Sequence, residues 1–283
     1  MPRRRERDAG GARGPAGERR AQQRRDLPRH PPHARSRRHA RPDPARGGRD
    51  GGARPRGAGR LRRRLPHGFP AACVRGSPEV RRQVAFMRAV FASGTPAFGS
   101  CAGLQVATAA AGGTVRSNRR GYEAGFARRI TRTEAGTAHP LLDGRPRAWD
   151  APAIHSDEVD RLPDGATALA GNRVTSVQAA EIRHGGGVFW GVQYHPELPL
   201  SDIAAALRRQ VDDLRESGLA LDERAVETYA ARVAALHHDP ARRDVAWQLG
   251  LDEQVADPAR RSIELRNFVE HLVKPTRSAR GRA

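Results

Sequence analysis

Cys101 is the residue of this chain whose type and setting best suit nucleophilic chemistry. It lies in FGSCAGLQVA, residues 98–107, with Gly99 and Gly103 on either side. Small neighbours permit a sharp turn from a strand into a helix, which lifts the sulfur clear of the sheet. The positive end of the helix favours the thiolate, and the backbone N–H of Ala102 points to where an oxyanion would form. The alternative is a buried, inert cysteine in a core, because such cysteines are common.

A second segment supplies the base that such a nucleophile needs. In GVFWGVQYHPELP, residues 187–199, His195 and Glu197 follow an apolar run and flank Pro196. Residues two apart at the end of a strand project to the same side. A carboxylate beside an imidazole fixes its tautomer and stabilises its protonated form, and Pro196 restricts His195 to extended conformations. The alternative is a surface His–Glu ion pair that closes a strand.

The elements that must position these residues are indicated by apolar periodicity and by turn signals. The expected helices, with their terminating glycines, cover 79–94, 102–113, 201–216, 222–238, 241–249 and 258–273. The expected strands cover 95–100, 123–132, 166–170, 175–183 and 187–194. The last helix has an apolar face made by Ile263, Leu265, Phe268, Val269 and Leu272. Strands followed by helices, with the cysteine at a strand-to-helix turn, predict an α/β sheet.

The net charge of +20 is concentrated in one segment. Residues 1–78 hold 23 arginines against 6 acidic residues, whereas the rest of the chain is nearly neutral. The segment has one Val, one Phe and no Ile, Tyr or Trp. It therefore buries too little apolar surface to offset its ordering entropy, and we expect it to be disordered. Such Arg/Pro/Gly-rich text also results when a GC-rich message is translated in the wrong frame, which we favour over a genuine tail.

Composition also bears on the class of protein. Two cysteines, Cys73 and Cys101, exclude a disulfide framework. The chain shows no apolar run of membrane-spanning length and no signal-peptide apolar region, so we expect a cytoplasmic protein that does not bind membranes. A nucleic-acid partner is disfavoured, because the basic segment has no interleaved aromatic residues to stack on bases. The run His237-His238-Asp239 is interpreted as a helix end rather than a metal site.

The motifs together carry a resemblance to a known family. GSCAGLQ, followed farther along by GVQYHPE, resembles the class I glutamine amidotransferases, in particular stand-alone domains similar to the glutaminase half of GMP synthase. The resemblance runs from about Glu79 to about Leu214, and its order and spacing are specific. It implies a flavodoxin-like, doubly wound α/β sheet with a nucleophile elbow. The expected regions are 1–78, an incomplete amidotransferase-like domain at 79–217 and a helical C-terminal extension at 218–283.

The resemblance implies a Cys-His-Glu triad for glutamine hydrolysis. Cys101 is the nucleophile, His195 the general base and acid, and Glu197 the residue that orients the imidazole. The thiolate attacks the side-chain amide of glutamine, His195 protonates the departing ammonia, and water hydrolyses the thioester. No metal or organic cofactor is called for. We expect ammonia to pass to an acceptor on a partner synthetase, because no ATP-activating domain is recognised in the chain.

The resemblance also implies residues that hold the substrate. Ala102 contributes a backbone oxyanion donor, and Gly103 and Gln105 bind the substrate. Ser100 and Ala102 replace bulkier residues often found beside the nucleophile in this family. We expect this difference to alter the shape of the pocket rather than the chemistry.

Two alternative functions are consistent with the sequence, and the composition of the N-terminal quarter affects these two and the glutaminase function alike. The nearest rival is a γ-glutamyl hydrolase or peptidase of the same fold, and a more distant one is an inactive domain with a basic nucleic-acid-binding arm. In the resembled family, the opening stretch supplies the first strands and a second oxyanion donor. Nothing in residues 1–78 reads as a strand, and Gly76 in RGSPEV (75–80) is a weak match to the donor loop. We therefore expect a chain that lacks these strands, folds poorly and is impaired in activity.

Overall fold

The computed structural model describes residues 77–281 of the chain. The expectations for the basic N-terminal segment, including disorder, a frame error and a donor at Gly76, concern residues that lie almost wholly outside this range. Ser77 and Pro78 are described, and they begin the first helix. The side-chain Oγ of Ser77 accepts a hydrogen bond from the Val80 N–H at 3.3 Å, and Pro78 occupies the first helical position.

The described chain contains both helices and strands as far as β8 and is helical after it. The strands are β1 (Ala97–Ser100), β2 (Thr114–Ser117), β3 (Glu123–Arg132), β4 (Ala148–His155), β5 (Asp157–Arg161), β6 (Ala166–Gly171), β7 (Ala179–His184) and β8 (Gly187–Val192). The first helices are α1 (Pro78–Ala92), α2 (Ala102–Ala110), α3 (Glu134–Thr137) and the 3-10 turn η1 (Pro140–Leu142). The later ones are α4 (Leu200–Arg209), α5 (Val211–Glu216), α6 (Glu223–His238), α7 (Arg243–Leu249), α8 (Glu253–Ala256), α9 (Pro258–Arg261), α10 (Ile263–Phe268), the π-helical turn η2 (Val269–Val273) and α11 (Lys274–Arg280).

The main sheet is mixed. Its strand order is β1-β8-β7-β6-β3-β4, and β2 and β5 form a separate antiparallel pair. Among the described residues, β1 and β8 form the parallel pair of the main sheet, and its other neighbours run antiparallel. The parallel pairing sets Ser100 opposite Val192, so the two strands end side by side. The residues that follow them, including Cys101 and His195, are therefore brought to one edge of the sheet.

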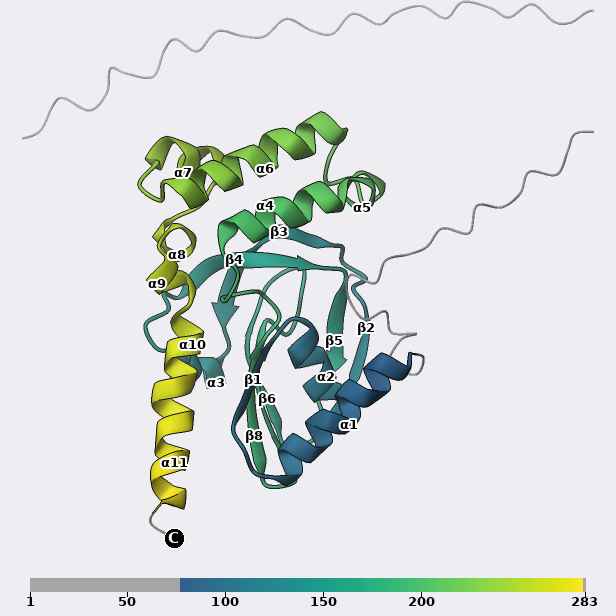
Figure 1. The fold of residues 1–283 in the computed structure, drawn as a ribbon, viewed down its shortest axis with the longest axis vertical. Helices are drawn as coiled ribbons and strands as arrows, with labels where there is room; N and C mark the ends of the chain where they lie inside the picture. Colours follow the sequence, from purple (N-terminus) through teal and green to yellow (C-terminus); the bar gives the residue numbers. More distant parts are fainter. Residues whose placement is uncertain (1–76, 282–283) are drawn as a thin grey trace, which may run out of the picture. The chain divides into compact units, whose positions relative to one another are not determined.

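Helices cover both faces of this sheet (Figure 1). On one face, α1 and α2 pack on β7 and β8 through Phe91, Leu104 and Phe189. On the other face, a cluster that includes Trp149 and Trp190 meets η1 and the C-terminal helices. The predicted flavodoxin-like α/β class with helices on both faces is confirmed, with a sheet that is mixed rather than parallel.

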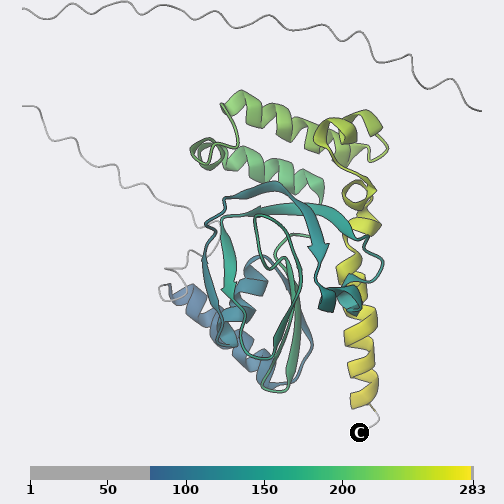
Figure 2. The ribbon, with the colours of Figure 1, turned by 180° about the vertical axis from the view of Figure 1, so that it is seen from behind.

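The predicted C-terminal helical extension is also confirmed, and here it comprises α6–α11. Helix α6 packs on α4, and Figure 1 shows the two helices lying across β3 and β4. Helix α6 ends at His238, so the His-His-Asp run closes a helix as predicted, and no cluster of metal-ligating side chains is found in residues 77–281. From the opposite side, Figure 2 shows α9, α10 and α11 running along one side of the sheet. No helix in the described part of the chain has the length and hydropathy to cross a bilayer.

The structure contains strands that the sequence pattern did not predict. Strand β4, with the sequence AWDAPAIH, has no clean alternation of apolar and polar residues because Asp150 and Pro152 interrupt it. Proline is tolerated there because β4 lies at the edge of the sheet, where a missing N–H costs no ladder bond. Strands β2 and β5 were missed as well. The predicted helix over 201–216 is divided at Gln210, and the last helix continues to Arg280.

Candidate active site

The predicted elbow between β1 and α2 is present. Cys101 has φ 48° and ψ −104°, a strained backbone conformation for a residue with a side chain. Its N–H donates to the Val192 carbonyl at 2.8 Å, which fixes the turn to the end of β8. Cys101 is 7% exposed and is the N-cap residue of α2, so it lies at the N-terminus of a helix. Strain of this kind at a single cysteine is typical of a functional turn rather than of a core position.

Gly99 explains how the helix can come so close to the strand. A Cβ atom at Gly99 would lie 2.9 Å from the Gly103 Cα and 3.0 Å from the Phe189 Cζ. Neither contact leaves room for a side chain. Gly103 itself has open space where its Cβ would be, so the face of α2 beside Cys101 is clear. The two glycines therefore differ: Gly99 allows close packing of α2 on β1, and Gly103 leaves space beside Cys101.

His195 lies within hydrogen-bonding reach of both Cys101 and Glu197. Its Nδ1 donates to Glu197 Oε1 at 2.7 Å, and its backbone N–H donates to the Pro152 carbonyl at 2.7 Å. Burial alone would lower the pKa of His195, but the hydrogen bonds with Cys101 and Glu197 outweigh it and raise the pKa to about 9. The structure thus brings together the three residues that the sequence singled out. A pKa of about 9 keeps the His195 ring protonated at neutral pH.

Glu197 has a second partner that the sequence did not reveal. The Ser100 hydroxyl donates to Glu197 Oε1 at 2.7 Å, so the residue before Cys101 holds the carboxylate that contacts His195. Burial would raise the pKa of Glu197, but the hydrogen bond from His195 and the bond from Ser100 lower it. Ser100 was expected to affect only the shape of the pocket. Its hydroxyl instead belongs to the hydrogen-bond chain of the site.

Gln105 lies one helical turn beyond Cys101, on the inner side of α2. Its side chain is 2% exposed, and its Nε2 donates to the Asp157 carbonyl at 3.3 Å and to Gln193 Oε1 at 3.4 Å. Its Oε1 has no partner among the described residues. In this arrangement Gln105 supports the floor of the site, and its role in binding substrate stays a prediction.

A buried polar network lies at the adjoining ends of β3 and β4. The Glu123 carboxylate accepts hydrogen bonds from Asn172, Thr175 and Gln178 at 2.7, 2.7 and 2.6 Å, and the His155 Nε2 lies 3.0 Å from it. Burial would raise the pKa of Glu123, but the contact with His155 and these hydrogen bonds lower it. His155 is therefore part of this internal network.

Tyr122 lies at the margin of the site. Burial raises the pKa of its hydroxyl, and electrostatic interactions with Asp213 and Cys101 raise it further. Tyr122 is half-buried and packs against the helices of the α4–α6 cluster. Tyr122 therefore lies between Cys101 and α5, the helix that carries Asp213.

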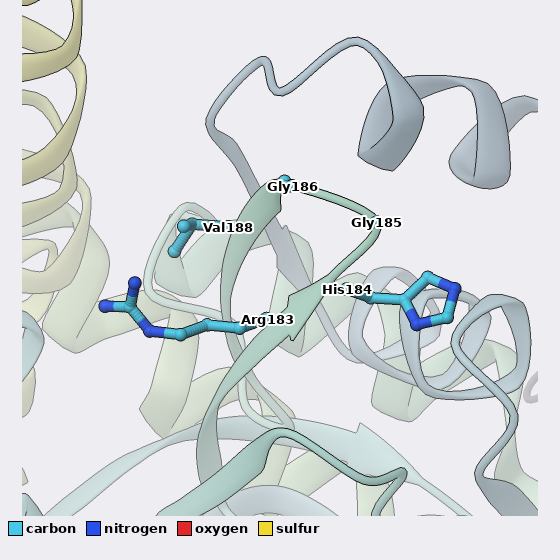
Figure 3. A pocket seen from close by; sticks show the side chains of 6 residues that line it. Arg183, His184, Gly185, Gly186 and Val188 are labelled. Atoms are coloured by element: carbon cyan, nitrogen blue, oxygen red, sulfur yellow. The ribbon is translucent and has the colours of Figure 1, made fainter.

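A hollow elsewhere on the molecule is separate from this site. It has a volume of about 290 Å³ and lies beside the β7–β8 hairpin, residues 183–188 (Figure 3). Arg183 and His184 point to opposite sides of the hairpin there. The hairpin includes Gly187, the first residue of β8, whereas Cys101 is bonded to Val192, the last residue of that strand. The hollow and the elbow therefore lie at opposite ends of β8.

Comparison with known proteins decides the family. The family model for glutamine amidotransferase class-I matches residues 74–211. A γ-glutamyl-L-1-hydroxyisopropylamide hydrolase from a Pseudomonas species is 40% identical over 201 residues, which cover 69% of this chain and 67% of the relative. The chain belongs to the class I glutamine amidotransferases. The resemblance inferred from the sequence motifs, and with it the assignment to an enzyme family, is confirmed.

Members of this family from other branches match shorter stretches. A subunit of the glutamine-hydrolyzing GMP synthase of Methanoculleus marisnigri is 36% identical over 107 residues, covering 37% of this chain and 53% of that subunit. The chain therefore spans about half the length of this amidotransferase relative. A solved glutamine amidotransferase from Thermotoga maritima superposes with a TM-score of 0.49 at 18% identity, over 72% of this chain and 74% of that one.

Proposed function

We propose that this amidotransferase hydrolyses γ-glutamyl amides through a Cys-His-Glu triad of Cys101, His195 and Glu197. The proposal rests on one observation, the arrangement of these three side chains. A strained cysteine at the N-terminus of α2 shares a hydrogen bond with an imidazole whose other nitrogen lies 2.7 Å from a carboxylate. Glutamine is the simplest substrate of this class, and N-substituted γ-glutamyl amides are the other.

The reaction follows from the protonation states of the site. The Cys101 sulfur attacks the γ-carbonyl carbon, and the carbonyl electrons move onto oxygen. The Ala102 N–H, in the first helical turn of α2, has no intrahelical partner and stabilises that oxyanion. When the C–N bond breaks, the His195 imidazolium gives its proton to the departing amine. The neutral imidazole then takes a proton from water, which attacks the thioester and releases glutamate.

The leaving group separates two candidate activities. For glutamine it is ammonia, and we propose that a partner synthetase then receives it, since the M. marisnigri relative is named as part of a glutamine-hydrolysing synthase. For an N-substituted amide it is an alkylamine that needs no partner. The Pseudomonas hydrolase favours this second candidate, because it is more similar to this chain and matches a longer part of it.

A glutamate-release assay tests the proposal and separates the two candidates. The purified chain is given glutamine, γ-glutamyl-isopropylamide or isoglutamine, whose amide is at the α-carboxyl group and whose γ-carboxylate is free. We expect glutamate from one or both γ-amides and none from isoglutamine. A preference for the isopropylamide by kcat/KM identifies a γ-glutamyl amide hydrolase, and the reverse preference identifies a glutaminase. Absence of glutamate from both γ-amides would contradict the proposed function.

The raised pKa of His195 predicts the alkaline limit of activity. The ring loses its proton as pH rises through about 9, and kcat/KM should fall there because the leaving amine loses its acid. Since the pKa lies above the ordinary value of 6.5, the ring's contribution to stability is complete below pH 6.5 and is lost as pH rises through about 9. The measurement is kcat/KM against pH. As a control, Glu197→Gln removes one cause of the shift and should move the alkaline limb to lower pH; an unmoved limb would contradict the assignment.

A further inference from the structure

Tyr194 links the residue before His195 to the C-terminal extension. Its hydroxyl donates to Glu264 Oε1 at 2.6 Å, and Glu264 lies on α10. Both side chains are fully buried. Burial raises the pKa of the Tyr194 hydroxyl well above its ordinary value, and the Glu264 charge raises it further, so the hydroxyl keeps its proton and remains a donor. A direct bond thus joins the segment that carries His195 to a helix outside the residues matched by the family model.

Glu264 is itself held rigidly. Arg145 donates a hydrogen bond of 2.7 Å to each carboxylate oxygen, from Nε to Oε1 and from Nη2 to Oε2. The same guanidinium donates to Gln254 Oε1 at 3.1 Å and to the Arg261 carbonyl at 2.9 Å. A bidentate pair of this kind fixes direction as well as distance. The acceptor offered to Tyr194 therefore has one defined position.

The segment after β8, which carries His195, has no regular secondary structure, so individual side-chain and backbone contacts must hold it in place. Gln193 donates its N–H to the Gln178 carbonyl at 2.8 Å, and His195 donates its N–H to the Pro152 carbonyl at 2.7 Å. Between these two anchors, Tyr194 is held by ring packing on Trp149, with centroids 6.5 Å apart at 78°, and by its bond to Glu264. Rotation of the backbone at Tyr194 would turn the adjacent His195 away from the sulfur.

We propose that Glu264 is a positioning residue for His195, acting through the Tyr194 hydroxyl. The inference rests on the proposed function, because it assumes that the imidazole of His195 serves Cys101. It assigns the C-terminal extension a part in the active site of this chain. The alternative is that the extension only covers a face of the sheet, in which case Glu264 would contribute to stability and leave the titration of His195 unaffected.

Tyr194→Phe is the variant that tests this most directly. It removes one hydroxyl, keeps the ring on Trp149 and leaves the Arg145–Glu264 pair intact. We expect the pKa of His195, followed by NMR of the full chain, to fall, because the ring spends less time bonded to Cys101 and Glu197. The alkaline limb of kcat/KM should move with it. We expect kcat to fall about tenfold or more with KM little changed, as for a misplaced catalytic group.

Two further variants separate positioning from stability. Asn267→Ala removes bonds from α10 to the Leu141 and Asp143 carbonyls, at 3.0 and 2.8 Å, without contacting Tyr194. It should lower Tm and leave the pKa of His195 unchanged. Glu264→Gln keeps an acceptor oxygen for the hydroxyl but removes the charge facing Arg145. It should therefore lower Tm more than Tyr194→Phe does, yet shift the pKa of His195 less.

The pKa of His195 in these variants decides whether Glu264 positions the ring. An unchanged pKa of His195 in Tyr194→Phe would overturn it, and so would an equal pKa shift in Asn267→Ala. The NMR titration requires no substrate, so this result is independent of the substrate assay. Failure of the proposed function would show instead as γ-amide hydrolysis that is absent or that survives loss of Cys101, whatever the titration gives.

Discussion

Cys101→Ala is expected to abolish γ-glutamyl amide hydrolysis, lowering kcat by about four to six orders of magnitude, as removal of a nucleophile does in other acyl-transfer enzymes. The reason is that the proposed acyl intermediate forms on the Cys101 sulfur, which alanine lacks. The fold should survive, because the backbone N–H that bonds to the Val192 carbonyl is unchanged and alanine is smaller than cysteine. The measurement is single-turnover glutamate release, with circular dichroism to compare the folds.

Two companion measurements make this result specific. Mass spectrometry of acid-quenched enzyme should show a γ-glutamyl adduct on the peptide that contains Cys101, and none in the alanine variant. Cys73→Ser is the matched control, since Cys73 is the other cysteine of the chain and has no role in the mechanism. It should retain wild-type activity. If Cys101→Ala still turned over γ-amides at a normal rate, the thiolate mechanism would be excluded.

The core of this site could be predicted because its chemistry is encoded locally. Glycines beside Cys101 indicated a turn with little steric room, and the spacing of His195 and Glu197 indicated side chains on one side. That these two segments meet is a property of the sheet. It depends on β1 and β8 being parallel neighbours that end at the same edge, with Ser100 opposite Val192. Local sequence patterns do not specify which strands pair. The prediction that the two segments meet therefore came from the family resemblance.

The residues that support the site were missed for a different physical reason. Periodicity assigned apolar residues to the buried face of the last helix, yet Val269 is 42% exposed, while Glu264 and Asn267 are buried. A buried carboxylate is recognisable only once its partner is known, and Arg145 lies far away in the sequence. The role of the Ser100 hydroxyl is likewise recognisable only once its partner is known, because Glu197 lies on a different segment of the chain. Side-chain partners of this kind depend on tertiary structure.

The buried pair of Arg145 and Glu264 carries the largest expected effect on stability. Both side chains are fully shielded from solvent, and the two carboxylate oxygens each accept a bond at 2.7 Å. Burial alone would lower the pKa of Arg145, but the Glu264 charge and hydrogen bonds raise it, so the guanidinium stays charged. Arg145→Met leaves Glu264 buried without its counter-charge. We expect a loss of about 3–5 kcal/mol in the free energy of unfolding, measured by urea denaturation.

The double variant Arg145→Met/Glu264→Leu tests the origin of that loss. Once both charges are gone, no ion is left unpaired, and apolar side chains of similar volume can fill the space, so most of the lost stability should return. Activity should not return with it, because Tyr194 has lost its acceptor. Arg242→Ala is the matched control: its ion pair with Asp244 is as short, at 2.6 Å, but exposed, and its removal should leave unfolding close to wild type. If Arg145→Met were no less stable than Arg242→Ala, the buried ion pair would not be what holds the extension to the sheet.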